Sequence, residues 1–503
     1  MGEPFYITTA ISYPNGPPHI GHAYEAIAAD AMARFQRAQG RDVRFQTGTD
    51  EHGLKMAQAA RAEDLEPRAF AEKMARLFQH MCDTLNVSYD RFIRTSQPDH
   101  YRASQAIWKA MKERGDLYLD RYEGWYSVRD EAYYEPEELL SADDGSKLSP
   151  QGTPVEWTVE ESWFFRLSKY QQPLLDHYAA NPDFIRPESR RNEVVRFVEG
   201  GLKDLSISRT SFDWGVPVPG SNSHVMYVWL DALTNYITGL GYPDETELWQ
   251  RYWPADVHLI GKDVVRFHAV YWPAFLMSAG IALPKQVYGH GFLLSRGEKM
   301  SKSVGNVVDP MVLADRFGVD ALRYFLLREV TFGQDGSYSA EAIVARANAE
   351  LANSFGNLAQ RALSMIHKNL GGVLPASGDD PADKALLDLV HRTASEDMPE
   401  AFDRFGFSFG IEAWIKAVFA CNQYVDTQAP WTLRKTDPER MAAVLGTLVV
   451  AVRELTQAIA PIIPDAAGKL ISLIDAGEGG TPIPQPTPLF PRLELPEEDE
   501  EAA

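Results

Sequence analysis

The chain has 503 residues, 45% hydrophobic and 24% charged, a composition typical of globular proteins and a length that suits two to four domains. Its formal net charge of -21 argues against a nucleic-acid binder that uses its whole surface, although it allows a local basic track. With only two cysteines, Cys82 and Cys421, a disulfide framework and a multi-cysteine metal site are excluded.

Targeting and membrane signals are missing from the sequence. The first residues, MGEPFYITTA, lack a basic region followed by an apolar run, and Tyr6 breaks the myristoylation pattern. The longest nearly apolar run, residues 441–452, stops at Arg453 and is too short to span a bilayer. We therefore expect a cytoplasmic protein with no membrane partner.

The chain opens with a strand, a helix and a second strand. Residues 5–11 are β-branched and aromatic and predict a buried strand, and apolar side chains at helical spacing predict a helix over 22–39. Gly40 stands where a left-handed helix cap belongs, and residues 42–53 predict a strand that runs into a polar loop. This order indicates an α/β fold with a doubly wound, Rossmann-like parallel sheet, which binds ligands beyond the carboxyl ends of its strands.

The character of the sequence changes twice further along. Residues 114–212 are rich in turns, Tyr, Trp and Glu, and predict an inserted domain, after which strand-and-helix alternation resumes. From about 331 the strand signals vanish, and long amphipathic helices up to about 475 predict an all-α helical bundle. Residues 481–496 form a Pro-rich extended segment that precedes an acidic end.

Two histidines three residues apart, His19 and His22, stand with Gly21 where the first loop turns into a helix, in the stretch PPHIGHAYEA. One interpretation is structural, because prolines favour helix starts and surface histidines often have no functional role. A second stretch, GEKMSKSVGN at 297–306, holds Lys299 and Lys302 between two glycines. Lysines in a glycine-flanked loop can follow a phosphate whose charge develops during a reaction, whereas by themselves they could be a solvated turn.

Together, HIGH at 19–22 and KMSKS at 299–303 resemble the two signatures of the class I aminoacyl-tRNA synthetases. The resemblance implies that an amino-acid carboxylate attacks the α-phosphorus of ATP, supplied with Mg²⁺, and that an aminoacyl adenylate forms before transfer to tRNA. It assigns catalysis to His19, His22, Lys299 and Lys302. The ATP-binding residues would be His19, Gly21, His22, Asp263, Lys299 and Lys302.

The implied amino acid is methionine. The class I enzymes for isoleucine, valine and leucine carry a large hydrolytic editing insertion, because one methylene gives only about 1–3 kcal/mol of discrimination. The insertion in this chain is too small for such an editing domain. The stretches TAISYPNGPPHIGHAYEAIAADA, TGTDEHG, YVWLDA and GKDVVRFHAVYWPAFL are similar to those of methionyl-tRNA synthetases. Carried over residue by residue, methionine would be bound by Ile11, Tyr13, Asp50, Trp229, Ala232, Tyr236, Phe267, His268 and Trp272.

The roles that follow differ among these residues. Asp50 would bind the α-ammonium, and the Tyr236 hydroxyl and the Ile11 backbone N–H would face the thioether sulfur. Aromatic residues on helices and strands are usually core residues, so each aromatic member has that alternative. His52 and Glu51 could serve only to shape the loop around Asp50.

The helical region carries the residues that match the anticodon-reading positions of methionyl enzymes. Asn357 and Arg361 are four apart on one helix face, and Trp431 follows Pro430 at a helix start. The alternative is a tryptophan in the bundle core and an arginine on a solvated face. The resemblance therefore implies tRNA(Met), including the initiator tRNA, as the partner.

Two departures from many relatives lead to further expectations. Ser127, Asp130, Ser149 and Gly152 stand where relatives carry zinc-binding Cys-x-x-Cys pairs, so we predict no structural zinc. The C-terminus shows a Pro-rich, acidic tail in place of a dimerising β-barrel, which favours a monomer.

The expected domains follow from the same resemblance. They are the two halves of the catalytic domain at 1–113 and 213–330, the inserted connective-peptide domain at 114–212, the anticodon-binding domain at 331–480 and the tail at 481–503. Two alternatives stay open at this point. The chain could be an inactive tRNA-binding relative, or a class I synthetase for another unedited amino acid such as cysteine.

Overall fold

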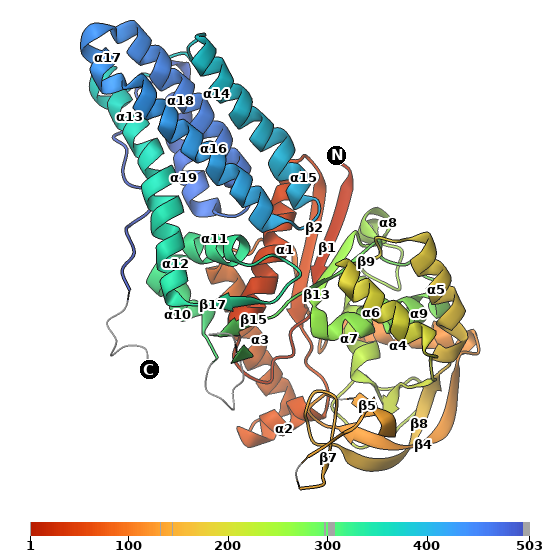
Figure 1. The fold of residues 1–503 in the computed structure, drawn as a ribbon. Coiled ribbons are helices and arrows are strands. Elements are labelled where there is room, and N and C mark those ends of the chain that lie inside the picture. Colours follow the sequence, from red (N-terminus) through yellow and green to blue (C-terminus); the bar gives the residue numbers. More distant parts are fainter. Residues whose placement is uncertain (1, 131, 143, 296–297, 300–306, 496–503) are drawn as a thin grey trace. The chain divides into compact units, whose positions relative to one another are not determined.

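The protein is described by a computed structural model that covers residues 2–130, 132–142, 144–295, 298–299 and 307–495. It divides into two compact units (Figure 1). The first consists of Met1–Ala29, Gln39–Asp83 and Ser88–His290, and the second of Asp30–Ala38, Thr84–Val87 and Gly291–Ala503.

A six-stranded parallel sheet forms the centre of the first unit, as the sequence predicts. Its strands lie in the order β3 (Arg91–Arg94), β2 (Asp42–Thr49), β1 (Pro4–Thr9), β13 (Val257–Gly261), β14 (Val287–His290) and β9 (Ile185–Arg186). The sheet changes direction of winding between β1 and β13, because β2 and β3 follow β1 on one side and the later strands lie on the other. Loops at the carboxyl ends of β1 and β13 therefore diverge, which opens space for a ligand.

Helix α1 (Ile20–Ala38) connects β1 to β2 and confirms the predicted strand–helix–strand order. It begins two residues before the predicted start, and Gly40 takes the expected positive φ of 81° just after its end. The remaining helices of this unit are α2 (Leu54–Ala62), α3 (Pro67–Thr84), α4 (Pro98–Glu113), α5 (Gln171–Ala180), α6 (Glu188–Glu199), α7 (Val228–Thr238), α8 (Glu247–Tyr252) and α9 (Trp272–Ala279).

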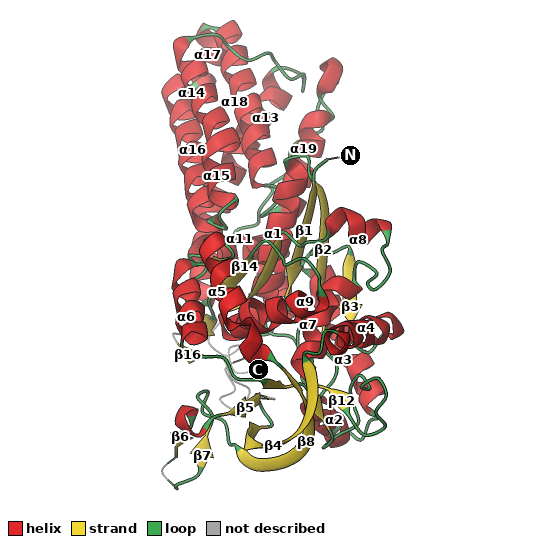
Figure 2. Ribbon diagram, turned by 90° about the vertical axis from the view of Figure 1, so that its right-hand side faces the viewer, coloured by secondary structure: helices red, strands yellow, loops and turns green. Residues whose placement is uncertain are grey.

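The predicted insertion contains a long, curved pair of antiparallel strands, β4 (Leu117–Ser127) and β8 (Glu156–Phe165), which Figure 2 shows in yellow. Its short strands are β5 (Ala132–Tyr134), β6 (Leu140–Ser141), β7 (Lys147–Leu148), β10 (Leu205–Ser206) and β11 (Ser208–Arg209), and β11 pairs with β12 (Val225–Met226), which lies beyond residue 212.

The second half of residues 114–212 differs from a self-contained insertion. Strand β9 pairs in parallel with β14 of the central sheet, and the helices on either side of it contribute to the same apolar core as α7 and α9. The sequence gives little sign of this, since β9 has only two residues and no alternation to detect.

The second unit begins with a small sheet and continues as helices. Strands β15 (Leu293–Ser295), β16 (Glu298–Lys299) and β17 (Gly336–Tyr338) form the sheet, so one short strand does occur after residue 331. The helices are α10 (Pro310–Phe317), α11 (Val319–Glu329), α12 (Ala340–Arg346), η5 (Ala347–Gly356), α13 (Asn357–Asn369), α14 (Pro381–Arg392), η6 (Thr393–Asp397), α15 (Met398–Phe402), α16 (Phe407–Gln428), α17 (Pro430–Thr436), α18 (Pro438–Ile459) and α19 (Pro464–Asp475).

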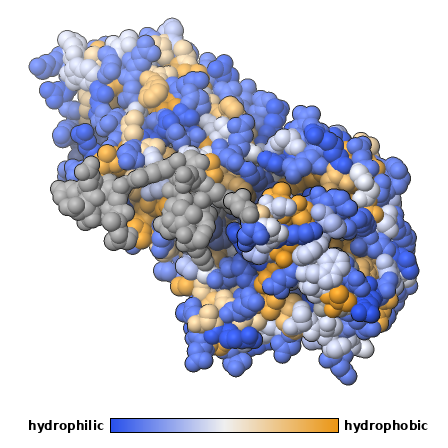
Figure 3. All heavy atoms as spheres, turned by 60° about the horizontal axis from the view of Figure 1, so that its bottom comes forward, coloured by the Kyte–Doolittle hydropathy of each residue, from blue (hydrophilic) through white to orange (hydrophobic). Residues whose placement is uncertain are grey.

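Helix α18 lies at the core of the predicted bundle, where it packs against α13, α14, α16, α17 and α19 (Figure 1). Of the described helices it alone is long and apolar enough to cross a membrane, and 61% of its apolar window is buried inside the protein. Burial against five helices explains the apolar run at 441–452 as bundle core. On the face in Figure 3, hydrophilic residues predominate and apolar residues form separate patches.

The described part of the Pro-rich tail lies against the bundle rather than extending away from it. Ile483 is buried, and its backbone N–H donates to the Gly372 carbonyl at 2.9 Å. Asn348 exchanges two side-chain hydrogen bonds with the backbone of Leu493, at 2.8 and 2.9 Å. These contacts supply the backbone hydrogen bonds that an extended segment cannot make by itself.

Candidate functional site

The loops that follow β1 and β2 are joined directly to each other at the carboxyl edge of the sheet. The Ser12 N–H donates to the Gly48 carbonyl, and the Asp50 N–H donates to the Ser12 carbonyl, both at 2.9 Å. Ile11 and Tyr13 flank Ser12, so three predicted methionine-binding residues, Ile11, Tyr13 and Asp50, meet here.

The two histidines of the first motif cap helix α1 reciprocally. The Gly21 N–H donates to Nδ1 of His19, and the His19 N–H donates to Nδ1 of His22, both at 3.1 Å. A Cβ on residue 21 would lie 2.9 Å from Cε1 of His19, so only glycine allows the His19 ring to fold back over the helix start. This is the geometry of a capping box, with imidazole nitrogens in place of oxygens.

This cap has a chemical consequence for both rings. Because each Nδ1 accepts a hydrogen bond, the proton of each neutral imidazole resides on Nε2. Both rings lie at the N-terminus of a 19-residue helix, where the helix dipole favours anions. An Nε2–H donor at a helix N-terminus is suited to a phosphate oxygen.

Glu51 holds the loop around Asp50 from one side. Its buried carboxylate accepts hydrogen bonds from Arg94 Nε at 2.7 Å and from the Thr49 hydroxyl at 2.7 Å, and it also accepts from the Ser96 hydroxyl. Its backbone carbonyl accepts from the Trp214 indole N–H at 2.6 Å. Glu51 therefore fixes the loop and does not face a substrate, as one of the sequence alternatives states.

His52 holds the loop from the other side through a buried carboxylate. Asp231 Oδ2 lies 2.6 Å from Nδ1 of His52, and its Oδ1 lies 2.7 Å from Nε2 of His100. Burial raises the pKa of Asp231, but the two histidines lower it more, to about 2. Sequence reasoning missed Asp231 and His100, although Asp231 stands in the quoted stretch YVWLDA and is a charged residue within an apolar helix.

The aromatic residues proposed for methionine divide into two groups. Trp229 on α7 and Phe267 stack face to face, with ring centroids 3.7 Å apart and planes 6° apart, and both are half-buried. Trp272 is fully buried, and its indole N–H donates to Nε2 of His258 at 3.3 Å. Trp272 is thus as deeply buried as Tyr236, and its contact with methionine stays a prediction, whereas Trp229 and Phe267 are partly exposed.

Tyr236 and His268 form a buried pair, with the Tyr236 hydroxyl 2.6 Å from Nε2 of His268. Burial lowers the pKa of His268 to about 4, so the ring is neutral. Its Nδ1 lies 2.9 Å from the Val264 carbonyl, which can only accept, so Nδ1 carries the proton and Nε2 accepts from the hydroxyl. Ala232 is buried one helical turn before Tyr236 on α7.

Glu25, three residues after His22 on α1, forms a partly buried pair with a histidine of the sheet. Oε2 of Glu25 is 2.8 Å from Nε2 of His290, the last residue of β14. Burial raises the pKa of Glu25, and His290 partly offsets this rise. Both His22 and Glu25 line a small pocket together with the ends of β1 and β2. Sequence reasoning missed this pair.

The remaining predicted ATP-binding residues are less fully described. Asp263 is exposed in the short turn that follows β13. Lys299 ends strand β16, where its backbone pairs with Leu294 of β15. Lys302 lies outside the described residues.

The three predicted anticodon-binding residues lie in the helical unit. Asn357 is exposed at the start of α13, and Trp431 is 45% exposed at the start of α17, which excludes a place in the bundle core. The Arg361 guanidinium lies 5.4 Å from the centre of the Trp431 ring, and its Nη2 lies 3.2 Å from Asp426 Oδ1. The structure thus brings Arg361 and Trp431 together at the surface.

Hydroxyl groups surround Asp130 at the positions where relatives carry zinc ligands. Asp130 Oδ2 accepts from Ser149 Oγ at 2.6 Å and from Thr153 Oγ1 at 2.7 Å, and Ser127 Oγ lies 2.6 Å from Thr153 Oγ1. Ser and Thr hydroxyls are not zinc ligands. Among the residues that the structure describes, no three His, Cys, Asp or Glu side chains are grouped to hold a metal ion.

Comparison with known proteins shows the family to which the chain belongs. A sequence model of the family described as tRNA synthetases class I (M) matches residues 5–363, and one described as the anticodon binding domain of methionyl tRNA ligase matches residues 391–486. The methionine--tRNA ligase of Brucella suis is 58% identical over 505 residues, which cover 97% of this chain and 98% of that protein.

Solved structures agree with the sequence matches. Mycobacterium tuberculosis methionyl-tRNA synthetase in complex with methionyl-adenylate has a TM-score of 0.94 at 55% identity, covering 97% of this chain and 100% of that one. Its apo form has a TM-score of 0.88 at 51% identity, with 99% of both chains covered. These matches span both units of the fold and include both signature motifs. The chain therefore belongs to the methionyl-tRNA synthetases of class I, the family of methionine--tRNA ligases.

Proposed function

We propose that this methionine--tRNA ligase forms methionyl-adenylate at the edge of the sheet between β1 and β13, and that it reads its tRNA on the exposed surface of α13 and α17. In the first step a methionine carboxylate oxygen attacks the α-phosphorus of ATP, and the bond to the bridging oxygen breaks, so that pyrophosphate leaves. In the second step a ribose hydroxyl at the tRNA 3′ end, usually the 2′ hydroxyl in this class, takes the methionyl group and AMP leaves.

Methionine recognition divides between a charge and an apolar wall. Asp50, on the loop fixed by Glu51 and His52, would accept hydrogen bonds from the α-ammonium. The side chain would lie against Trp229 and Phe267. A thioether sulfur is polarizable and packs well beside aromatic rings. The Tyr236 hydroxyl donates its hydrogen bond to His268, so the Ile11 backbone N–H would be the group that donates to the sulfur, with Tyr236 beside it.

Phosphate chemistry would depend on donors rather than on a general base. His19 and His22 offer Nε2–H groups at the N-terminus of α1, Lys299 and Lys302 would stabilise the charge that develops on the leaving pyrophosphate, and Gly21 and Asp263 would contact the nucleoside. The observation that carries the proposal is the reciprocal imidazole cap, because it sets both histidines in the tautomer that a phosphate needs.

Mg²⁺ would enter with ATP, held mainly by the phosphates. Magnesium sites of this kind use one or two carboxylates together with substrate phosphates. The ion would neutralise phosphate charge. The proposal also covers tRNA(Met) of both the initiator and elongator kinds, a cytoplasmic location, a monomeric state, no structural zinc and the domain limits given above.

Replacing the second lysine tests the catalytic assignment. In Lys302→Ala we expect methionine-dependent exchange of pyrophosphate into ATP to fall by about 10²–10³-fold, because one preorganised donor is lost from the transition state. Methionine binding, measured by calorimetry, should stay within about twofold, since the pocket is untouched. Lys285→Ala is the matched control, because Lys285 is an exposed lysine paired with Asp256. Near-normal exchange in Lys302→Ala would contradict the assignment.

A further inference from the structure

A long helix carries two of the proposed anticodon residues and changes its winding midway. Helix α12, the π-helical segment η5 and α13 run without a break from Ala340 to Asn369, and the backbone stays helical at both joints. The Ser354 hydroxyl donates to the Ala349 carbonyl five residues earlier, at 2.7 Å. Because a π segment adds residues to each turn, it sets the rotation of everything that follows it.

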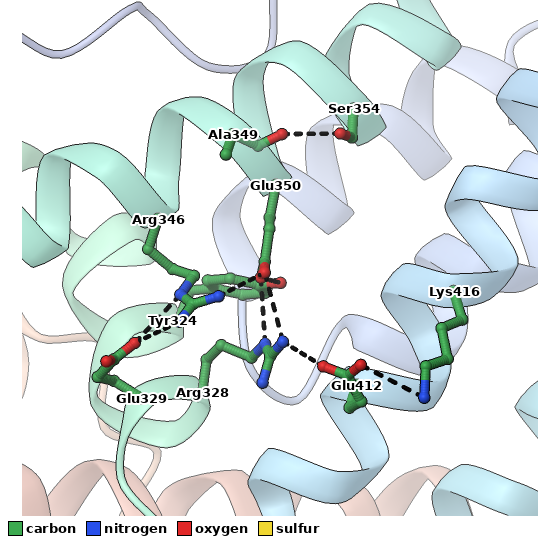
Figure 4. Close-up of polar contacts among 9 residues, drawn as sticks. All are labelled: Tyr324, Arg328, Glu329, Arg346, Ala349, Glu350, Ser354, Glu412 and Lys416. Atoms are coloured by element: carbon green, nitrogen blue, oxygen red, sulfur yellow. Dashed lines mark hydrogen bonds and ion pairs between the residues drawn. The ribbon is translucent and has the colours of Figure 1, made fainter.

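Glu350 is the centre of a buried polar network within the π segment (Figure 4). Its carboxylate accepts from the Tyr324 hydroxyl at 2.6 Å, from Arg346 Nη1 at 2.7 Å and from Arg328 Nε at 3.2 Å. Burial raises the pKa of Glu350, but these hydrogen bonds outweigh it and leave the pKa below its usual value. The segment is thus anchored to α11 by charge-assisted hydrogen bonds.

The network continues from α11 to α16. Arg328 Nη2 contacts Glu412 of α16, whose other carboxylate oxygen lies 3.4 Å from Lys416 Nζ (Figure 4). Further along α16, Asn422 Nδ2 donates to the Ser354 carbonyl of η5 at 3.2 Å, so the long helix and α16 are also joined directly. Arg328 therefore bridges a buried carboxylate on the long helix and a second carboxylate on α16.

The same pair of helices meets again at the anticodon surface. Arg361 of α13 contacts Asp426 near the end of α16, and α17 with Trp431 follows directly. Arg361 lies 11 residues after Glu350 on the same continuous helix. The Glu350 network and the Arg361–Trp431 contact therefore lie at two ends of the same packing between the long helix and α16.

We propose that Glu350 and Arg328 are positioning residues for tRNA recognition, which set the rotation and register of the long helix against α16 so that Asn357 and Arg361 face the Trp431 side. The inference rests on the anticodon role proposed for these three residues. Neither Glu350 nor Arg328 contacts the tRNA in this account. Without the anchored π segment, a change of one residue in helical phase would turn Asn357 and Arg361 by about 100° away from Trp431.

Glu350→Gln tests the proposal, because it keeps the shape of the side chain and removes its charge. We expect the KM for tRNA in aminoacylation to rise by about 10-fold or more, since small misplacements of recognition groups have effects of this size. Pyrophosphate exchange and the kcat for charging should stay within about twofold. Selectivity against a tRNA with one substituted anticodon base should fall. Glu341→Gln, at an exposed glutamate on α12, is the matched control and should behave as the parent enzyme.

Two outcomes would overturn the proposal. One is a folded Glu350→Gln variant, with the parent's circular dichroism and melting temperature, that keeps the parent's KM and anticodon selectivity. The other is an equal loss of exchange and charging, which would indicate a general folding role. Trp431→Ala separates this inference from the proposed function. If Trp431→Ala impairs tRNA recognition and Glu350→Gln does not, only the positioning role fails, whereas no effect of Trp431→Ala would remove the anticodon assignment itself.

Discussion

At the scale of single residues, the site depends on side chains that fix other side chains. His19 and His22 satisfy backbone N–H groups at the start of α1 with their Nδ1 atoms, which orients both rings before any ligand binds. Glu51 and His52 directly follow Asp50, and each is held by side-chain hydrogen bonds. Preorganised groups of this kind stabilise a transition state without reorganising during the reaction.

Asp231 provides a test at this scale. In Asp231→Asn the loop loses the charge that holds His52, so Asp50 becomes less ordered and we expect the KM for methionine to rise by about 10-fold. The KM for ATP should stay near that of the parent. Steady-state exchange kinetics check both values. The exposed Asp244, paired with Arg102, gives the control variant Asp244→Asn. Equal increases in both KM values would point to a general disturbance of the site.

The pH dependence of this effect follows from the low pKa of Asp231. Its carboxylate is ionised in the folded protein above a pKa of about 2, below its usual 3.8, so its contribution to stability is complete above 3.8 and is lost as the pH falls through about 2. The ratio of methionine KM values between variant and parent should therefore stay constant from pH 6 to pH 9. A ratio that changes within this range would assign the effect to another group.

Site residues within a recognisable sequence motif could be predicted, whereas residues whose role depends on burial in the fold could not. The spacing of His19 and His22 is visible in the sequence, but their reciprocal cap depends on where the helix begins. Asp231 and His100 are 131 residues apart and meet only because α4 packs against α7. Trp272 and Trp229 look alike in the sequence, yet the first is fully buried and the second is partly exposed.

At the scale of elements, α13 and α17 form the surface proposed for the anticodon. An exposed Trp431 ring with an arginine beside it offers a stacking platform for an unpaired base, and such stacking is worth about 1–3 kcal/mol per base. The π winding of η5 could not be predicted, because its residues follow ordinary helical periodicity. Strand β17 was missed since three residues give no pattern.

Trp431→Ala tests this surface directly. We expect kcat/KM for tRNA charging to fall by about 5- to 100-fold through lost stacking, with methionine-dependent exchange unchanged. Aminoacylation and exchange assays on the same preparation make the comparison. Phe419→Ala, at an exposed aromatic on α16, is a suitable control. A parallel loss of both activities would indicate that Trp431 serves folding instead.

At the scale of the whole molecule, the order of elements along the chain predicted the parallel sheet and the bundle correctly, because strand–helix–strand units allow few topologies. The limits between parts were harder to predict. Strand β9 returns to the central sheet from within the expected insertion, and the Pro-rich segment packs on the bundle through Ile483. Both features depend on long-range backbone pairing, which local composition does not reveal.

The defining activity of this enzyme is the formation of methionyl-adenylate. Its most direct test is exchange of labelled pyrophosphate into ATP with each of the twenty amino acids supplied singly. We predict exchange with methionine and background exchange with the others, cysteine included. Exchange with none of the twenty would contradict the account and favour a tRNA-binding protein without activity, and exchange with a different amino acid would contradict the methionine site.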